Sequence, residues 1–404
     1  MAPEITIYGA PWCPDCRRSK KFLSDLRVPY NWVDIDRDPA GAALVKEMNG
    51  GKQIIPTIVF ADGSFLTEPA DDELAQKLGL ELRANRTFYD LIILGGGPAG
   101  LTAAIYGARE GIDCLVIEKS ALGGQAGVTE RIDNYPGFPD GVGGAELAGR
   151  IIDQARRYGV ELLSAVAVES IGRDGDLIGV RTTSGDEYCS RAVIIATGST
   201  YRRLDVPGEE ELIGAGIHFC ATCDGPFYKG SQDLVVVGGG NSGVEEGLFL
   251  TQFTDRVHLV EFMPELKASA LLQEKIRAHP KFDIRTNTEV LEFRGEGKLR
   301  SILVRDRATG ATEELPAQGA FIFIGLTPNT AFLKGAVELD RGGFVVTDDT
   351  HQSSLPGVFA AGDVRMGSTK QLASATGEGV TALLMARQHL QQLGEVAPRE
   401  AEAV

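Results

Sequence analysis

A chain of 404 residues with 43% hydrophobic residues and 50 glycines is too long for one core, so it predicts two or three globular domains. The formal net charge of -16 is spread along the chain, and no block of lysine or arginine suggests a nucleic-acid surface. The first residues lack a basic stretch followed by an apolar one, and no apolar run approaches the roughly 18 residues of a membrane span. We therefore expect a cytoplasmic protein with neither a nucleic-acid nor a membrane partner.

The first eighty residues predict an α/β fold of their own. The expected elements, in chain order, are a strand at 5–8, a helix at 17–26, a strand at 30–35, a second helix, a strand at 58–60 and a helix at 71–80. Gly63 is expected to turn the third strand towards the last helix.

Four of the six cysteines form two CxxC pairs, Cys13 with Cys16 and Cys220 with Cys223. Such pairs indicate redox chemistry or metal binding. They lie 204 positions apart (220 − 16), in segments that predict different folds, so redox chemistry is favoured over a shared zinc site. Cys13 is expected to lie beside a helix N-terminus, whose partial positive charge favours a thiolate, and is therefore the expected nucleophile.

The segment Trp12-Cys13-Pro14-Asp15-Cys16 and the Ile55-Pro56 dipeptide before the third strand resemble the thioredoxin superfamily, and glutaredoxins or mycoredoxins most of all. The resemblance covers about the first 80 residues and implies that Pro56 has a cis peptide bond and faces the disulfide. Glutathione-binding glutaredoxins carry Gly-Gly after the last strand, where this chain has Leu-Thr-Glu-Pro at 66–69, which leaves glutathione binding open. A docking domain that has lost its chemistry is the alternative.

After a short polar link, a strand at 89–94 runs into Gly95-Gly96-Gly97-Pro98-Ala99-Gly100 and then into a helix through residue 109. Glycines in this context let a pyrophosphate approach the helix N-terminus, where free N–H groups stabilise negative charge. Glu118, which is 18 residues past Gly100 (118 − 100), is expected to accept hydrogen bonds from a ribose.

The same unit recurs as a strand at 234–237, Gly238-Gly239-Gly240-Asn241-Ser242-Gly243, a helix through residue 251 and a strand at 256–260 that leads to Glu261. Glu261 is again 18 residues past the third glycine (261 − 243). Two fingerprints predict two dinucleotides, one a tightly held flavin and the other an exchangeable nicotinamide.

Three further segments, Ala196-Thr197-Gly198, Cys220-Ala221-Thr222-Cys223-Asp224-Gly225 and Val358-Phe359-Ala360-Ala361-Gly362-Asp363, make residues 89–390 resemble the low-molecular-weight thioredoxin reductase family. The resemblance implies FAD at the first fingerprint, with the residues Gly95, Gly97, Pro98, Ala99, Gly100, Glu118, Gly124, Gln125, Asn134, Thr197, Gly198, Gly362, Asp363, Lys370 and Gln371. It implies NAD(P) at the second, with Gly238, Gly240, Asn241, Ser242, Gly243, Glu261 and Lys267. It also implies a homodimer.

The fold class expected is α/β, a thioredoxin/glutaredoxin-like fold followed by two Rossmann-like dinucleotide-binding domains. The expected bounds are 1–81 for the glutaredoxin-like domain, 82–88 for a linker, 89–201 and 326–393 for the FAD-binding domain, 202–325 for the NAD(P)-binding domain with the redox CxxC, and 394–404 for a flexible tail. The helix that closes the FAD-binding domain is expected at 373–393.

The resemblance implies that Cys223 faces the flavin, that Cys220 is the exchange thiol and that Asp224 is the acid/base, although a turn residue before Gly225 is the plainer interpretation of Asp224. Because one domain cannot present the pair to the flavin and to a second disulfide at once, the middle domain is expected to rotate. Cys13 and Cys16 would then be a fused acceptor at high effective concentration.

Thioredoxin reductases that use NADPH carry His-Arg-Arg after the second strand, whereas this chain has Glu261-Phe262-Met263-Pro264-Glu265-Leu266-Lys267. Glu261 would repel a 2′-phosphate and hold a free 2′-hydroxyl, which favours NADH over NADPH. The segment, with Lys370-Gln371, resembles the flavoprotein subunit of alkyl hydroperoxide reductase, which is NADH-dependent and recharges a peroxiredoxin. That family has two tandem thioredoxin folds where this chain has one, so a peroxiredoxin, a thioredoxin and a glutaredoxin-like protein all remain candidate acceptors.

Two alternatives remain: a thioredoxin reductase that uses NADPH, and a flavin and thiol redox sensor without sustained turnover. The five histidines show no metal-ligand spacing and are expected to be ordinary surface or core residues, so no metal site is expected. Cys114 and Cys189 stand alone in predicted strands and are expected to be small apolar residues.

Overall fold

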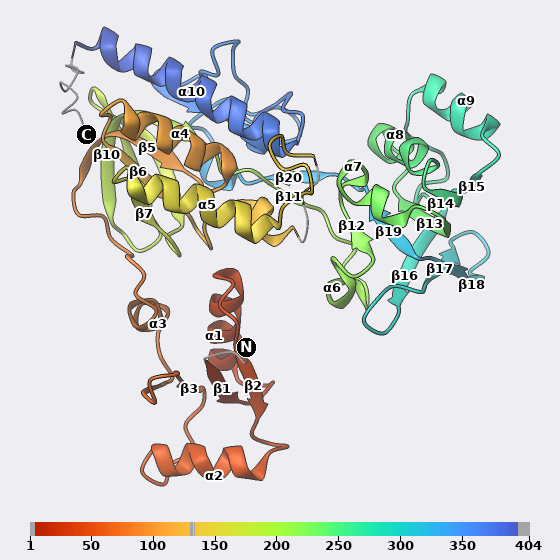
Figure 1. Cartoon of the computed structure of the whole chain (residues 1–404), viewed down its shortest axis with the longest axis horizontal. Coiled ribbons are helices and arrows are strands. Elements are labelled where there is room, and N and C mark those ends of the chain that lie inside the picture. The colour runs from red at the N-terminus through yellow and green to blue at the C-terminus, as the bar shows by residue number, and fades with distance from the viewer. Residues whose placement is uncertain (1–4, 130–131, 133, 395–404) are drawn as a thin grey trace. The chain divides into compact units, whose positions relative to one another are not determined.

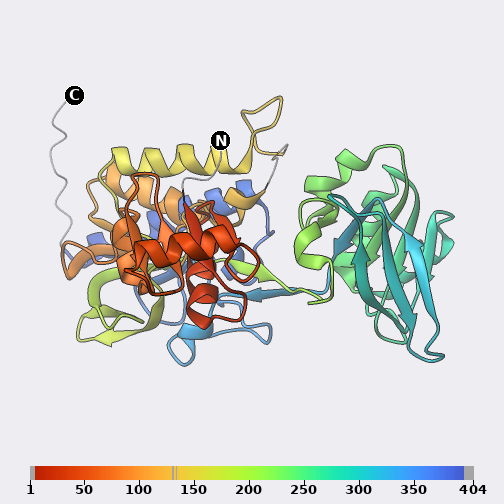
Figure 2. The same cartoon turned by 90° about the horizontal axis from the view of Figure 1, so that it is seen from below.

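The computed structural model describes residues 5–129, 132 and 134–394. The chain divides into two compact units, which are coloured along the chain in Figures 1 and 2. The first unit comprises residues 1–128, 145–198 and 328–404, and the second unit comprises residues 129–144 and 199–327. Apart from Gly394, the predicted tail at 394–404 lies outside the described residues.

A four-stranded sheet with the order β2-β1-β3-β4 opens the first unit. Its strands are β1 (Thr6–Gly9), β2 (Asn31–Asp34), β3 (Thr57–Val59) and β4 (Phe65–Thr67), and its helices are α1 (Pro14–Asp25), α2 (Pro39–Met48) and α3 (Asp71–Lys77). β1 pairs in parallel with β2 and antiparallel with β3. The helices and strands close on a small core in which Ile7, Leu23, Ile58 and Leu74 are fully buried.

Two details correct the prediction for this segment. Gly63, with φ +78°, turns β3 back into β4 as a hairpin, whereas the sequence was expected to continue from β3 to the last helix. The Asp-Gly dipeptide at 62–63 is the signal for that hairpin. The first helix begins at Pro14 instead of residue 17, because Cys13 is its N-cap and proline suits the first helical position.

The larger sheet of the first unit has the order β7-β6-β5-β10-β9-β8, with β21 beside β10. Its strands are β5 (Phe88–Leu94), β6 (Cys114–Ile117), β7 (Glu161–Leu163), β8 (Val168–Asp174), β9 (Leu177–Thr182), β10 (Glu187–Ile195) and β21 (Val358–Ala360). The helices are α4 (Pro98–Arg109), α5 (Gly144–Arg157) and α10 (Leu372–Gln392). Figure 1 shows α10 beside α4, and Leu101 and Leu383 are fully buried in the core that these helices share with the sheet.

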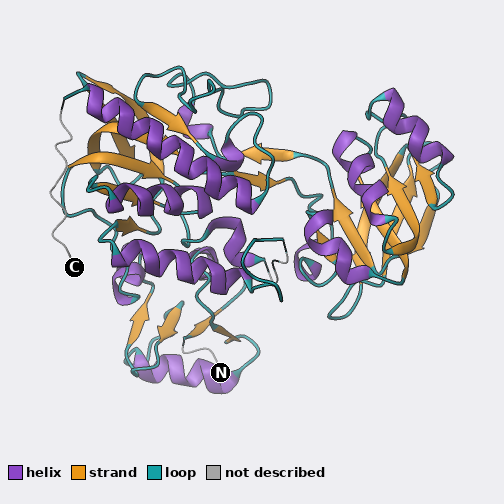
Figure 3. Ribbon diagram, turned by 45° about the horizontal axis from the view of Figure 1, so that its top comes forward, coloured by secondary structure: helices purple, strands orange, loops and turns teal. Residues whose placement is uncertain are grey.

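The second unit is built on an all-parallel sheet with the order β12-β19-β13-β14-β15. Its strands are β12 (Ile217–His218), β13 (Ser231–Val237), β14 (Thr254–Val260), β15 (Phe282–Arg285) and β19 (Gly319–Ile322). An antiparallel sheet of β16 (Thr288–Arg294), β17 (Ser301–Asp306) and β18 (Thr312–Pro316) accompanies it. The helices, purple in Figure 3, are α6 (Glu209–Leu212), α7 (Ala221–Asp224), α8 (Asn241–Leu250) and α9 (Ala270–Ala278).

Both large sheets have the central apolar strands that the sequence predicts. The last residues of β5 and β13 are apolar and buried, as parallel strands covered on both faces require. At the ends of the segment 199–327, β11 (Ser199–Tyr201) pairs with β20 (Leu326–Pro328). Among the described residues, none of the helices is both long and apolar enough to cross a membrane.

Candidate functional site

Cys13 and Cys16 lie at the start of α1, and both are free thiols in the structure. Cys13 is the N-cap, and its Sγ accepts the backbone N–H of Cys16 at 3.2 Å. Burial, reinforced by the contact with Cys13, raises the pKa of Cys16 to about 12. The helix N-terminus therefore stabilises negative charge on the Cys13 sulfur, whereas Cys16 stays protonated near neutral pH.

Pro56 follows a cis peptide bond, so the implied cis geometry is confirmed. The Cys13 thiol donates to the carbonyl oxygen of Ile55 at 3.7 Å, which brings the cis-proline segment to the cysteine pair. A Cβ on Gly9 would lie 2.6 Å from the Cys16 Sγ, so the close approach of β1 to the pair requires glycine. These contacts form a compact thiol site within the first unit.

The first glycine fingerprint joins β5 to α4, as the sequence predicts. Gly95 has φ +112°, and a Cβ there would lie 2.3 Å from the Ala196 carbonyl oxygen. A Cβ on Gly100 would lie 2.0 Å from the Gly95 carbonyl oxygen, so this glycine lets the helix pack on the loop. Gly97 is the N-cap of α4 and no side chain caps that end, which leaves backbone N–H groups for a phosphate. Pro98 and Ala99 are the first residues of α4.

Glu118 lies directly after β6 and is 8% exposed. Its Oε2 accepts the Gly96 N–H at 2.8 Å, and its Oε1 accepts the N–H and the hydroxyl of Ser120, both at 2.9 Å. The carboxylate is thereby fixed against the fingerprint loop. Oε2, which accepts one hydrogen bond, keeps lone-pair capacity for a ribose hydroxyl.

The other residues predicted to bind FAD lie on several segments. Gly124 and Gln125 are in a 3₁₀ turn at 124–128, and a Cβ on Gly124 would lie 2.9 Å from the Gly97 Cα, so two loops meet closely here. Gly198 has φ +66° and no atom near its Cβ position, and Thr197 donates to the Asn329 carbonyl oxygen at 2.8 Å. Asn134 belongs to the second unit.

Asp363 lies in a 3₁₀ turn after β21, and burial raises its pKa. The Nζ of Lys370 donates to the Asp363 carbonyl oxygen at 2.5 Å, and Gln371 is the N-cap of α10. The sequence reasoning missed Glu378, whose Oε2 accepts the Gly362 N–H at 2.9 Å and so fixes this turn. A single glutamate inside a long helix gives no sequence signal for that contact.

The second fingerprint joins β13 to α8 with the same geometry. Gly238 has φ +113°, and a Cβ on Gly243 would lie 1.9 Å from the Gly238 carbonyl oxygen. Gly240 is the N-cap of α8 without a side-chain cap and has open space at its Cβ position. The Asn241 side chain accepts the Ser269 N–H at 2.8 Å, and Ser242 is exposed at the start of α8.

Glu261 is 8% exposed and follows β14. Its Oε2 accepts the Gly239 N–H at 2.5 Å and its Oε1 accepts the Met263 N–H at 2.7 Å. Lys267 is exposed, and its backbone N–H donates to the Gly239 carbonyl oxygen. The sequence reasoning missed Arg307, which donates to the Phe262 carbonyl oxygen at 3.0 Å and stacks on that ring at 3.7 Å, because it comes 46 positions after Glu261 (307 − 261).

In the second cysteine pair, Cys220 lies directly before α7 and Cys223 belongs to that helix, and Cys220 is disulfide-bonded. The side chains of Thr222 and Cys223 lie outside the described part of the structure, so the predicted role of Cys223 stays a prediction. Asp224 lies with one carboxylate oxygen 3.4 Å from Nδ1 of His218. The Nε2 of His218 is 2.7 Å from the Tyr228 hydroxyl, so both ring nitrogens of this histidine face polar groups.

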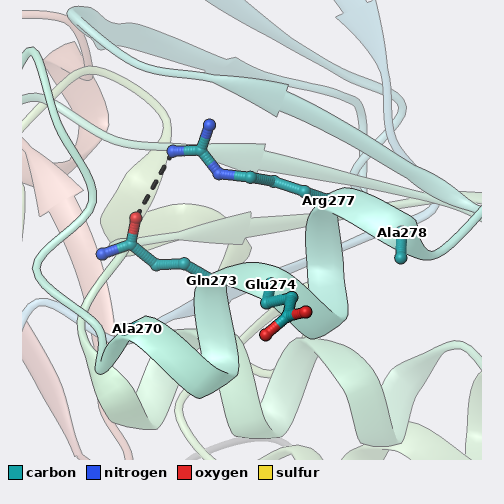
Figure 4. Close-up of a pocket in the computed structure, with 5 residues that line it drawn as sticks. All are labelled: Ala270, Gln273, Glu274, Arg277 and Ala278. Atoms are coloured by element: carbon teal, nitrogen blue, oxygen red, sulfur yellow. Dashed lines mark hydrogen bonds between the residues drawn. The ribbon is translucent and has the colours of Figure 1, made fainter.

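A hollow on α9 is lined by Ala270, Gln273, Glu274, Arg277 and Ala278, all from this one helix (Figure 4). Arg277 donates to the Gln273 side-chain oxygen at 3.3 Å within it. Neither a fingerprint glycine nor a cysteine is among these lining residues. Across residues 5–129, 132 and 134–394, no group of three acidic, histidine or cysteine side chains is arranged to hold a metal ion.

Comparisons with known proteins give two family matches. Residues 89–379 match the pyridine nucleotide-disulphide oxidoreductase family, and residues 5–66 match the glutaredoxin family. A thioredoxin reductase of Listeria innocua is 41% identical over 322 residues, which cover 79% of this chain and 99% of that protein. A bifunctional thioredoxin reductase/thioredoxin of Mycobacterium leprae is 40% identical over 76% of this chain and 67% of its own length. The crystal structure of a thioredoxin reductase from Streptococcus pyogenes aligns with a TM-score of 0.71 and 39% identity, covering 76% of this chain and 99% of that one.

Proposed function

The chain belongs to the pyridine nucleotide-disulphide oxidoreductase family, as a thioredoxin reductase-type flavoprotein with an N-terminal glutaredoxin domain, and we propose that it reduces that domain with electrons from NADH. The electrons reach the Cys220 and Cys223 pair, then the Cys13 and Cys16 pair, and finally a separate redoxin or peroxiredoxin. The domain bounds given above for residues 1–404 are part of this proposal.

The family implies FAD and NAD(P)H, and the two fingerprint loops fit such dinucleotides. Both α4 and α8 begin at a glycine N-cap without a side-chain cap, which leaves N–H groups for two pyrophosphates. Gly97 and Gly124 would hold FAD from one side, while Glu118 and Asp363 would bind its polar groups. Bound FAD supplies hydride acceptance and two-electron transfer to a disulfide.

The choice of NADH rests on Glu261. Its carboxylate is buried and held by two backbone N–H groups, so it is placed as a fixed negative charge after β14. Such a carboxylate binds a free ribose 2′-hydroxyl and repels a 2′-phosphate. The stacked Arg307 is the neighbouring cation that could support NADPH instead, which keeps the NADPH-dependent thioredoxin reductase as the second candidate.

The internal relay rests on Cys13. It is the sulfur that a helix N-terminus stabilises, and it is paired with a protonated Cys16 that can resolve a mixed disulfide. A protein named bifunctional thioredoxin reductase/thioredoxin offers a parallel, since a reductase and a thiol domain share one chain there. The final acceptor and the homodimer that the family resemblance implies are proposed from that resemblance alone.

The purified oxidised protein, mixed anaerobically with NADH and separately with NADPH, gives the decisive test through the bleaching rate of the flavin band. We expect NADH to react at least about tenfold faster. Glu261→Gln should narrow that ratio, because the fixed charge is removed, whereas Glu265→Gln, an exposed neighbour, should leave it unchanged. Faster reaction with NADPH would contradict the selector role of Glu261 and direct attention to Arg307.

A further inference from the structure

His218 lies two residues before Cys220 and contacts both Asp224 and Tyr228. Its Nδ1 is 3.4 Å from an Asp224 carboxylate oxygen, and its Nε2 is 2.7 Å from the Tyr228 hydroxyl. The His218 side chain is 12% exposed and that of Asp224 is 21% exposed, so water only partly screens their interaction. A carboxylate, an imidazole and a phenol are thus arranged in series next to a redox cysteine.

Packing fixes the imidazole in this position. The His218 ring is 5.3 Å from the Phe321 ring, and the Tyr228 ring meets both rings edge-on at 5.5 and 5.7 Å. A Cβ on Gly319 would lie 2.6 Å from the Tyr228 ring, so the glycine makes room for the phenol beside β19. The side chains are held by rings from β12, β19 and the turn at 225–228.

Tyr228 faces the Nε2 side of the His218 imidazole. Burial and the Asp224 charge raise the pKa of Tyr228 to about 12, so its hydroxyl keeps its proton near neutral pH. A hydroxyl that donates to Nε2 leaves the proton of a neutral imidazole on Nδ1, facing Asp224. His218 contacts two titratable groups among the described residues, Asp224 and Tyr228. Its contact with Phe321 of β19 brings no charge.

We propose that His218 is a positioning residue that, fixed by Tyr228, orients Asp224 for proton transfer during thiol–disulfide exchange. The inference deepens the proposed function and rests on its assignment of Cys220 as the exchange thiol. Neither the sequence pattern of the pair nor the family comparison assigns a role to this histidine.

The exchange balances in atoms and electrons. The Cys220 thiol gives its proton to Asp224, and the thiolate attacks one sulfur of the acceptor disulfide, whose leaving thiolate takes that proton. Cys223 then attacks the mixed disulfide, which closes the Cys220–Cys223 bond and releases the second acceptor thiolate, protonated by the proton of Cys223. Two electrons and two protons have moved to the acceptor.

The test measures one half-reaction: the full-length protein, reduced in advance, is mixed with the chromogenic disulfide 5,5′-dithiobis(2-nitrobenzoic acid) from pH 5 to 9. His218→Leu should slow exchange about tenfold at pH 7 and move the acidic limb of the profile up by about one pH unit, because Asp224 loses the imidazole that lies 3.4 Å from its carboxylate. His218→Asn, which keeps an N–H near the Nδ1 position, should retain most of the rate. His279→Asn, at the end of α9, is the matched control.

A double-mutant comparison of His218→Leu with Asp224→Asn distinguishes a positioning role of His218 from a general effect on the structure. In an Asp224→Asn background, His218→Leu should slow exchange no further, since the histidine acts through the carboxylate. Additive losses, or a wild-type profile in both His218→Leu and Tyr228→Phe, would overturn the inference. If His218→Leu fails to fold, His218→Asn and Tyr228→Phe carry the test. Failure of the proposed function itself would look different, because no nicotinamide would then bleach the flavin of the unmodified protein.

Discussion

The two cysteine pairs share the CxxC spacing but differ in what surrounds them. Cys13 is the N-cap of α1, and its sulfur accepts a backbone N–H. Both cysteines of this pair are free thiols. Cys220 is disulfide-bonded, and its pair is followed by a carboxylate that contacts an imidazole. Main-chain groups contact the first centre and ionisable side chains lie beside the second, so equal spacing does not imply equal surroundings.

The largest effect should come from removing one exchange sulfur at a time. Cys220→Ser should reduce turnover of any disulfide acceptor by more than about 100-fold, because both the direct and the internal routes begin there. Cys13→Ser should cause a similar loss only with a protein disulfide acceptor and leave 5,5′-dithiobis(2-nitrobenzoic acid) reduction intact. Steady-state NADH oxidation with each acceptor measures both.

Cys189→Ser, which changes a lone cysteine of β10, is the control for these two variants. Equal loss of both acceptors in Cys13→Ser would show that the two centres are not arranged in series. Full retention of protein-disulfide turnover in Cys13→Ser would remove the relay from the proposal.

A smaller effect should distinguish the two sulfurs within the first pair. Iodoacetamide should alkylate Cys13 at least about 10-fold faster than Cys16 at pH 7, because the raised pKa of Cys16 leaves it as a thiol. The rate at Cys16, measured by peptide mass spectrometry in Cys13→Ser, should keep rising as the pH increases towards 12. Burial of Cys16 would slow its alkylation at every pH. The pH dependence of the rate, and not the rate itself, is therefore the quantity that reports the raised pKa. A plateau below pH 9 would contradict the description of Cys16 as a buried thiol.

The smallest effect on catalysis should come from His258, a buried histidine of the second unit. His258 is 2% exposed, with Nδ1 2.8 Å from Asp283 and Nε2 3.0 Å from Asp233. His258→Leu should leave both carboxylates without this partner and lower the free energy of unfolding by about 2 kcal/mol at pH 7. Its rate of disulfide exchange should equal that of the unmodified protein.

The stability loss of His258→Leu should depend on pH, because the histidine contacts the Asp283 carboxylate. Burial alone would raise the pKa of Asp283, but hydrogen bonds from Arg285 and His258 outweigh it and lower the pKa below 3.8. A carboxylate with a lowered folded-state pKa stabilises the fold above its unfolded pKa and loses that contribution as the pH falls. The deficit of His258→Leu in urea denaturation should therefore shrink below about pH 4. A constant deficit would show that His258→Leu acts through packing and not through the contacts with the two carboxylates.

Much of the candidate site could be predicted from local sequence, because the glycines, cysteines and acidic residues that form it stand at fixed spacings along the chain. The loop from β5 to α4, the loop from β13 to α8 and the N-terminal pair all lie where the spacing predicts them. The hairpin of β3 and β4 was the exception in the fold, although its Asp-Gly turn was readable. No local pattern pointed to Glu378 or Arg307, which meet their loops only through long-range packing.

The sequence by itself determined the family, the two dinucleotide loops and the two CxxC pairs, because each depends on neighbours within about 20 residues along the chain. Only the tertiary structure decided how the ionisable groups are used. His258 became a buried bridge between β13 and β15, while His218 came to lie between Asp224 and Tyr228. Protonation depends on burial and on partners brought together by folding, which residue spacing does not encode.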